Sequence, residues 1–174
     1  MKKLLLIICL IATFAISANA QFHIELGMNG NSPQGDFEES YDLGIGFYFE
    51  PKYAISEKFD LGLLIGRNGF VGADFDGGGF GGLGILTILP TGTYRFTENN
   101  VTPYVGAGLG MYFIEGAEIT TGNTTVEEDS ESKFGFAPRA GVYIGRLNLG
   151  AAYNVVKDVN FIQFNLGIRI LSRD

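Results

Sequence analysis

Apolar residues alternate with small or polar residues along most of the chain after residue 21. A period of two is typical of β-strands, and no sustained helical spacing of apolar residues interrupts it. Each predicted strand has large apolar side chains on one face and mainly Gly, Tyr, Asn and Ala on the other. We predict eight strands, at about 22–29, 41–50, 59–66, 83–96, 101–113, 134–144, 147–155 and 162–170.

The fourth strand has the least regular pattern, because apolar residues fall on both of its faces between Leu83 and Leu89. Pro90 predicts a bulge or a break in pairing there, since proline lacks an N–H donor. Segment 115–133 is polar and acidic without apolar periodicity, which predicts a long loop. The other connections are long at 30–40 and 71–82, and short near Ser56, at 97–100, at 145–146 and at 156–158.

The composition of the second face distinguishes a soluble barrel from a membrane barrel. A soluble barrel would bury its apolar face and cover its exterior with Lys, Glu and Thr. Gly, Tyr, Asn and Ala instead suit the narrow interior of an eight-stranded barrel, which leaves the apolar face for lipid. Since sheet edges in hydrocarbon must close, we predict an all-β fold, a closed antiparallel up-and-down transmembrane β-barrel. A secreted, lipocalin-like soluble barrel is the alternative architecture.

The first twenty residues have the features of a cleavable signal peptide. Met1-Lys2-Lys3 is positive, 4–16 is an apolar run, and Ala18-Asn19-Ala20 is a cleavage motif. The run is shorter than the roughly 20 residues of a membrane-spanning helix, which disfavours a membrane anchor. We expect a signal peptide at 1–20 and one barrel domain at 21–174. Cys9, the only cysteine, lies within the apolar run, so no disulfide or lipid attachment is expected.

Length and charge narrow the class of protein. The chain has 174 residues, of which 46% are apolar and 18% charged, so it should fold as one domain. Its formal net charge is −7, and nucleic-acid binding needs clustered Lys and Arg. We therefore expect no nucleic-acid partner.

The alternation of long and short connections predicts the orientation in the membrane. Outer-membrane barrels have short periplasmic turns and longer external loops, which places both termini in the periplasm. Aromatic residues flank both predicted ends of the barrel, as interfacial girdles do. They are Phe59, Tyr94 and Phe96 on the short-turn side and Tyr41, Phe113 and Phe134 on the long-loop side.

Three short stretches carry a family resemblance: 103–110 (PYVGAGLG), 51–53 (PKY) and 138–142 (PRAGV). From Gln21 to Leu171 the chain resembles the small eight-stranded outer-membrane β-barrel family, similar to outer-membrane protein X and the transmembrane domain of outer-membrane protein A. The resemblance implies the cell outer membrane of a Gram-negative-type bacterium. It also implies contact with outer-membrane lipid and assembly by periplasmic chaperones and the barrel-insertion machinery. Family members often end in an aromatic residue, whereas this chain ends in Ser-Arg-Asp.

Candidate chemistry is sparse. His23, the only histidine, is expected to face inward near the periplasmic mouth, and nothing places a serine and an acid beside it as a general base would need. The glycines of 77–79 and 81–82 lack the Lys-Ser/Thr of a phosphate-binding loop. The acidic run 127–129 with Glu131 has oxygen ligands for a divalent cation, but a solvated loop is the preferred interpretation. No catalytic, cofactor-binding or metal-binding residue is predicted.

Isolated charges on the inward face are the more informative set. Uncompensated charge in a narrow interior is costly, so these residues should pair. The hypothesis is a luminal charge network of Glu25, Asp42, Glu50, Arg139 and Arg169. We favour a plug over a gate, since side chains fill the interior of an eight-stranded barrel.

These features predict a structural or surface-exposed outer-membrane component. We expect a monomer with external acidic loops, no enzymatic activity and no cofactor. A small, porin-like channel or transporter for ions or hydrophobic solutes is the alternative function. A lipid A-modifying enzyme that uses His23 is the third.

Overall fold

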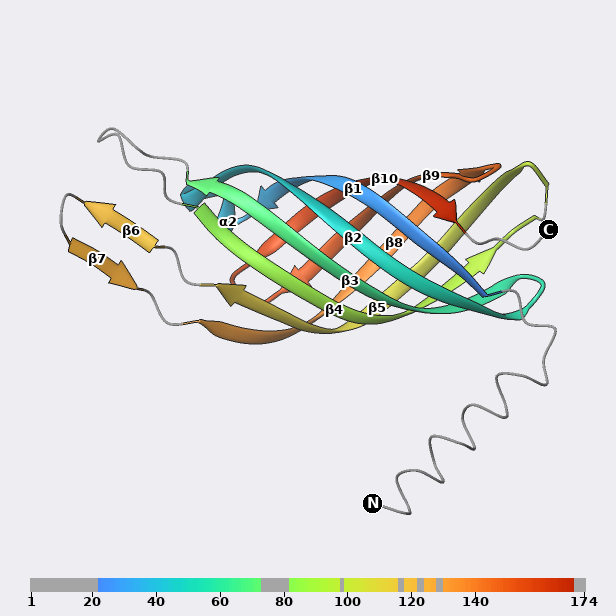
Figure 1. The fold of residues 1–174 in the computed structure, drawn as a ribbon, viewed down its shortest axis with the longest axis horizontal. Coiled ribbons are helices and arrows are strands. Elements are labelled where there is room, and N and C mark those ends of the chain that lie inside the picture. Colours follow the sequence, from blue (N-terminus) through green and yellow to red (C-terminus); the bar gives the residue numbers. More distant parts are fainter. Residues whose placement is uncertain are drawn as a thin grey trace, which may run out of the picture.

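The computed structural model describes residues 22–72, 82–97, 99–115, 118–121, 124–127 and 130–170. In these residues, long strands wrap into a barrel that carries a short helix and a small hairpin at one end (Figure 1). The elements are β1 (Phe22–Gln34), α2 (Asp36–Ser40), β2 (Tyr41–Ser56), β3 (Phe59–Gly72), β4 (Gly82–Arg95), β5 (Val101–Glu115), β6 (Glu118–Thr121), β7 (Thr124–Glu127), β8 (Glu131–Ile144), β9 (Leu147–Val156) and β10 (Asn160–Ile170).

The barrel closes in the order β1-β10-β9-β8-β5-β4-β3-β2, and β2 pairs with β1. Every pair is antiparallel, and the seam between β1 and β10 runs from Ile24↔Ile170 to Gln34↔Asn160. This arrangement confirms the predicted closed antiparallel barrel of eight strands. Within the described residues, no helix is long and apolar enough to cross a membrane.

The two ends of the barrel differ (Figure 1). At the short-turn end, tight turns join β2 to β3 and β8 to β9, and Gly145 takes a positive φ of 57° in the second turn. Glycine has no Cβ that opposes this conformation. The long-loop end carries α2 and the β6–β7 hairpin. The first strand, β1, begins at the short-turn end, and the last strand, β10, ends there. The chain therefore enters and leaves the barrel at the same end.

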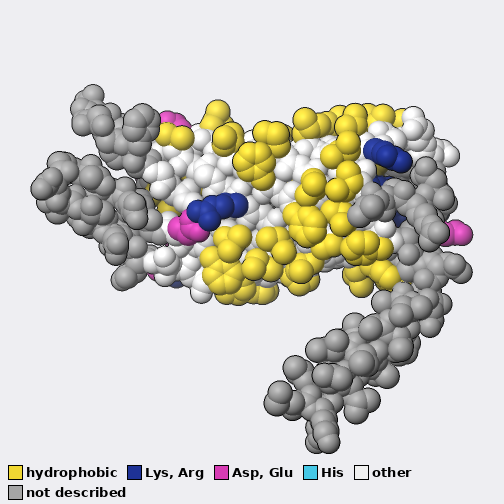
Figure 2. All heavy atoms as spheres, viewed as in Figure 1, with side chains coloured by type: hydrophobic (Ala, Val, Ile, Leu, Met, Phe, Trp, Pro, Cys, Tyr) yellow, Lys and Arg dark blue, Asp and Glu magenta, His cyan; other side chains and the backbone are white. Residues whose placement is uncertain are grey.

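Large apolar side chains point outward along the wall. The exposed fractions are 71% for Ile45, 61% for Phe47 and 59% for Phe164, whereas Glu25 and Glu50 are exposed by 0% and 1%. Figure 2 shows hydrophobic side chains spread over the wall between the two ends. The predicted orientation, with the apolar face outward, is confirmed.

Several boundaries differ from those predicted. β1 continues to Gln34 because residues 30–34 pair with β10, and β2 continues through Ser56 because residues 52–56 pair with β3. Both segments were assigned to connections. α2 occupies part of the predicted 30–40 loop, and the predicted loop at 115–133 contains the paired strands β6 and β7. The signal peptide at 1–20, Gly77–Gly79, Gly81, Glu128 and Asp129 lie outside the described residues.

β4 alternates cleanly despite its mixed composition. Of the two predicted outcomes at Pro90, a bulge or a break in pairing, the structure shows the break, and the register with β3 is continuous from Phe59↔Tyr94 to Val71↔Gly82. On the β5 side, pairing is missing at Leu89 and Pro90 and resumes in the same register. The missing N–H of proline accounts for a local gap in pairing without a shift of the strand.

Candidate functional site

Four charged side chains meet inside the barrel and form the luminal charge cluster: Glu25, Glu50, Lys52 and Arg139. Lys52 Nζ lies 2.8 Å from Glu25 Oε2 and 3.0 Å from Glu50 Oε2. Arg139 donates to both oxygens of Glu50, over 2.9 and 2.7 Å. The side chains are 8% exposed or less, and two positive charges offset two negative ones. Buried charge is tolerated when it is paired in this way.

The cluster reaches from one wall of the barrel to the other. Glu50 lies on β2 and Arg139 on β8, which are four positions apart in a closed ring of eight strands. Tyr143, also on β8, accepts a hydrogen bond from Lys52 Nζ over 2.9 Å and donates to Glu25 Oε2 over 3.1 Å. These bonds join opposite strands through the middle of the lumen.

Neutral groups complete the hydrogen bonding of the two carboxylates. Tyr48 donates to Glu25 Oε1 over 2.6 Å, and Asn148 donates to the same oxygen. Thr91 donates to Glu50 Oε1 over 2.7 Å. Each of the four carboxylate oxygens therefore contacts two donors, counting the bonds to lysine, arginine and Tyr143 described above. Such saturation is the condition under which ion pairs persist away from water.

Inward glycines make room for the large rings of this half of the lumen. A Cβ on Gly141 would lie 2.6 Å from the Tyr104 hydroxyl. Cβ atoms on Gly27 and Gly167 would collide with the Tyr48 ring and hydroxyl. The small residues on the second face are therefore the space into which the tyrosines fit.

The structure brings together three of the five predicted network residues: Glu25, Glu50 and Arg139. Arg169 also lies on the inward side of its strand, but its guanidinium sits 4.1 Å from the centre of the Tyr143 ring, and no ion pair involving it occurs among the described residues. Asp42 is exposed, so its predicted inward orientation is wrong. The register of β2 with β3 shifts between Tyr41 and Gly44, which breaks the alternation at this position.

Lys52 is the main functional residue that sequence reasoning missed. The predicted second strand ends at residue 50, which leaves Lys52 in the predicted short connection near Ser56. A usable signal existed, because Lys52 continues the even-numbered inward series of Tyr48 and Glu50. A further missed pair, Asp60 with Arg95 at 3.1 Å, lies on β3 and β4 toward the short-turn end.

The other candidates do not form a metal centre in the described residues. His23 is buried, with 4% exposed, on β1 at the short-turn end. No group of three or more His, Cys, Asp or Glu residues in the described ranges is placed to hold a metal ion.

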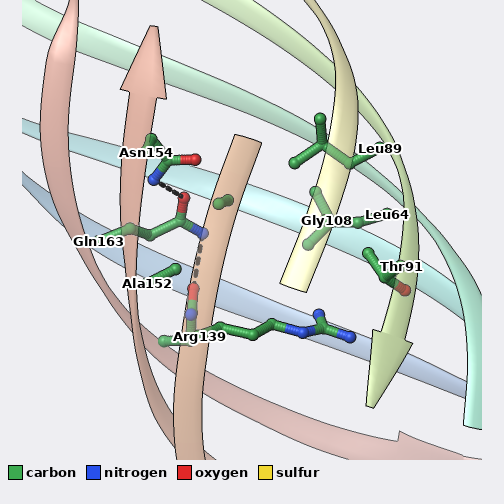
Figure 3. Close-up of a pocket in the computed structure, with 10 residues that line it drawn as sticks. Leu64, Leu89, Thr91, Gly108, Arg139, Ala152, Asn154 and Gln163 are labelled. Atoms are coloured by element: carbon green, nitrogen blue, oxygen red, sulfur yellow. Dashed lines mark hydrogen bonds between the residues drawn. The ribbon is translucent and has the colours of Figure 1, made fainter. Parts of the chain in front are cut away.

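A small cavity lies directly beside the charge cluster (Figure 3). Its volume is about 20 Å³, and Leu89, Thr91, Ala137 and Arg139 are among its lining residues. In Figure 3 the Arg139 side chain extends across the lumen below the Asn154–Gln163 hydrogen bond. This volume suits about one water molecule. This cavity therefore has no room for a larger ligand.

Comparisons with known proteins agree with this architecture. No family model matches the chain, and no curated protein matches its sequence. Neisserial surface protein A has a TM-score of 0.56 and 16% identity, over 88% of this chain and 99% of that chain. Ail, the attachment invasion locus protein of Yersinia pestis, has a TM-score of 0.56 and 18% identity, over 88% of this chain and 100% of its own, and was solved with the heparin analogue sucrose octasulfate. Together with the closed ring of strands, these similarities show that the chain has the fold of the small eight-stranded outer-membrane β-barrels.

Proposed function

We propose that the protein is an integral outer-membrane β-barrel with a structural or surface-exposed role and a lumen closed by side chains. The observation that carries the proposal is the inverted distribution of side chains. The described residues include 27 exposed large hydrophobic side chains, while the four charged members of the luminal cluster lie inside.

This distribution fits lipid as the surrounding solvent. Burying one large apolar side chain away from water is worth roughly 1.5–3 kcal/mol, so a wall of such residues is strongly unfavourable in water. The strand backbones of the barrel wall pair around a closed ring, which removes the sheet edges that a bilayer does not tolerate. A lipocalin-like barrel would have the opposite orientation, with its apolar residues inside.

We further propose the cell outer membrane of a Gram-negative-type bacterium as the location, with both termini in the periplasm and the long loops outside. The start of β1 and the end of β10 lie at the same end of the barrel as the short turns, which supports this orientation. A cleaved signal peptide at 1–20 and assembly by periplasmic chaperones and the barrel-insertion machinery belong to the same proposal. The barrel acts as a monomer that contacts outer-membrane lipid.

The closed lumen supports a structural role over a channel. The charge cluster is neutral, spans the bore and has saturated carboxylates. Opening it would require separating buried charges, which costs several kcal/mol for each ion left unpaired. In this proposal the protein is not an enzyme and holds no cofactor, and the external surface carries the biological role.

The external surface in this orientation is acidic. Segments 35–42, 73–81 and 116–130 contain four, two and four Asp or Glu residues, and none of them contains Lys or Arg. The fourth connection at this end, 157–159, contains Lys157 and Asp158 and adds no net charge. A surface with an excess of negative charge attracts cations and repels anions. We propose that the loops face cationic or neutral partners.

Membrane fractionation tests the proposal. The full chain, expressed in a Gram-negative host, should sediment with outer membranes, resist extraction by urea or carbonate, and migrate faster on SDS gels before heating than after. A chain without residues 1–20 is the control, and it should be absent from the outer-membrane fraction because it lacks the export signal. Recovery of the full chain in the aqueous phase of a detergent partition would contradict membrane integration.

A further inference from the structure

The long-loop half of the lumen has a different chemistry from the charge cluster. Eleven buried hydrophobic residues there form one packed group, which we call the apolar stopper. Most of its members are inward-facing residues near the long-loop ends of their strands. They are Phe37, Phe70, Leu83, Ile85, Leu89, Tyr112, Ile114, Ala137, Val156, Val159 and Phe161.

The apolar stopper spans the bore, as the charge cluster does. The Phe161 ring on β10 lies 5.3 Å from the Phe70 ring on β3 and 6.4 Å from the Tyr112 ring on β5, between centroids. β3 and β5 are each three positions from β10 in the closed ring, in opposite directions. Contacts from Phe161 to both of them therefore cross the middle of the lumen, where Phe161 and Tyr112 are 0% exposed.

Helix α2 adds a cap to the stopper from the long-loop end. Phe37 is its buried residue, 4% exposed, and its ring lies 5.0 Å from Phe70. The acidic residues of the same helix, Asp36, Glu38 and Glu39, are exposed. The short helix therefore inserts a single aromatic ring into the mouth and keeps its charges in water.

We propose that the apolar stopper is a second barrier to water and ions in the lumen, independent of the charge cluster. Narrow hydrophobic constrictions exclude ions because water does not fill them. The small cavity lies between the two barriers, since Leu89 and Ala137 belong to the stopper while Arg139 belongs to the charge cluster. The inference rests on the closed lumen of the proposed function and identifies what closes it toward the long loops.

Cysteine accessibility measures this barrier directly. Cys9 is the only cysteine, so an Ala137→Cys substitution in a Cys9→Ser chain places one thiol at the cavity. The protein is reconstituted into vesicles, and a charged methanethiosulfonate reagent is applied from the long-loop side. We expect slow modification in this background and an increase of about tenfold or more with Phe161→Ala, the change expected when about 1.4 kcal/mol of protection is lost.

Two matched variants complete the accessibility experiment. Phe164→Ala removes an outward ring from the same strand and should leave the modification rate unchanged. Glu50→Gln with Arg139→Gln removes the charges and the bidentate ion pair but keeps the stopper, and should also leave the rate from the long-loop side unchanged. Equal rates in the Phe161→Ala and Phe164→Ala chains would overturn the proposal.

Single-channel conductance separates failure of this inference from failure of the proposed function. We expect closed wild-type protein, closed Glu50→Gln/Arg139→Gln protein, and open pores when Phe37→Ala and Phe161→Ala are added to that double variant. A closed wild type with a conducting Glu50→Gln/Arg139→Gln variant would refute the second barrier and leave the closed lumen standing, as would a combined variant that stays closed. A conducting wild type would refute both.

Discussion

Substitution of Arg139 by alanine should destabilise the barrel strongly, because the side chain forms a buried ion pair with Glu50 inside the lumen. The change removes both hydrogen bonds to Glu50 and the 2.6 Å bond to Thr93. It also converts a neutral group of four charges into one with a net charge of −1. Breaking a buried ion pair by removing one partner costs about 3–5 kcal/mol, and we expect a loss of that size for Arg139→Ala.

A double-mutant cycle distinguishes charge imbalance from lost packing. Glu50→Gln in the Arg139→Ala chain restores neutrality, because Glu25 and Lys52 then balance each other. The double variant should be more stable than Arg139→Ala alone, with a coupling energy of about 0.5–3 kcal/mol. Arg67→Ala is the matched control: its ion pair with Glu115 is exposed, by 66% and 43% of the side chains, so the loss should be about 0–1 kcal/mol.

The chain has no tryptophan, so the assay should not depend on tryptophan fluorescence. Urea titration in lipid vesicles, with the folded fraction measured from unheated SDS gels and the strand content from circular dichroism, gives the free energy of unfolding. A loss below about 1 kcal/mol for Arg139→Ala, or a double variant no more stable than the single one, would refute the reasoning from buried charge.

Three further outcomes are expected. Gly167→Ala should destabilise the barrel by about 1–3 kcal/mol, because the added methyl group would displace Tyr48. Gly30→Ala is the control and should not destabilise it, since the space at the Gly30 Cβ position is open. Equal urea midpoints for the two variants would contradict this reasoning. Leu166→Arg should cost about 2–4 kcal/mol in bilayers if Leu166 lies near the membrane midplane, and an unchanged free energy of unfolding would argue against lipid at this face. The acidic loops should prevent binding of sulfated glycans to this protein, whereas Ail was solved in complex with a heparin analogue. Saturable binding to immobilised heparin at physiological salt would contradict the proposed acidic external surface.

The alternation of side chains was sufficient to predict the barrel and the lipid-facing orientation. Strict period two leaves few alternatives when one face is uniformly apolar, since a slip by one residue would reverse every side chain. β2 illustrates the limit of this reasoning. The predicted second strand ends just before Pro51, yet proline is compatible with a strand position that needs no N–H donor, and the pairing of β2 continues to Ser56.

The apolar stopper was beyond the reach of the same reasoning. Leu83, Ile85 and Phe161 are apolar and face inward, so their polarity alone assigns them to the wrong face. Their orientation follows from pairing with neighbouring strands and from contacts across the bore, which depend on residues distant in sequence. Glu25 and Arg139 were predictable as inward charges, but the partner of each required the strand order of the closed barrel.

The position of the ion pair between Glu50 and Arg139 bears on assembly. Three of the four cluster members, Glu25, Glu50 and Lys52, lie on β1 and β2 and together carry one surplus negative charge. Their remaining partner, Arg139, follows 89 positions after Glu50. A half-built sheet in a bilayer would leave that surplus carboxylate without its cation, and charge within a membrane costs at least about 2.5–3.5 kcal/mol. Joining early and late strands removes this penalty at a single step. Incomplete intermediates are thereby disfavoured, and insertion becomes closer to all-or-none than strand pairing alone would make it.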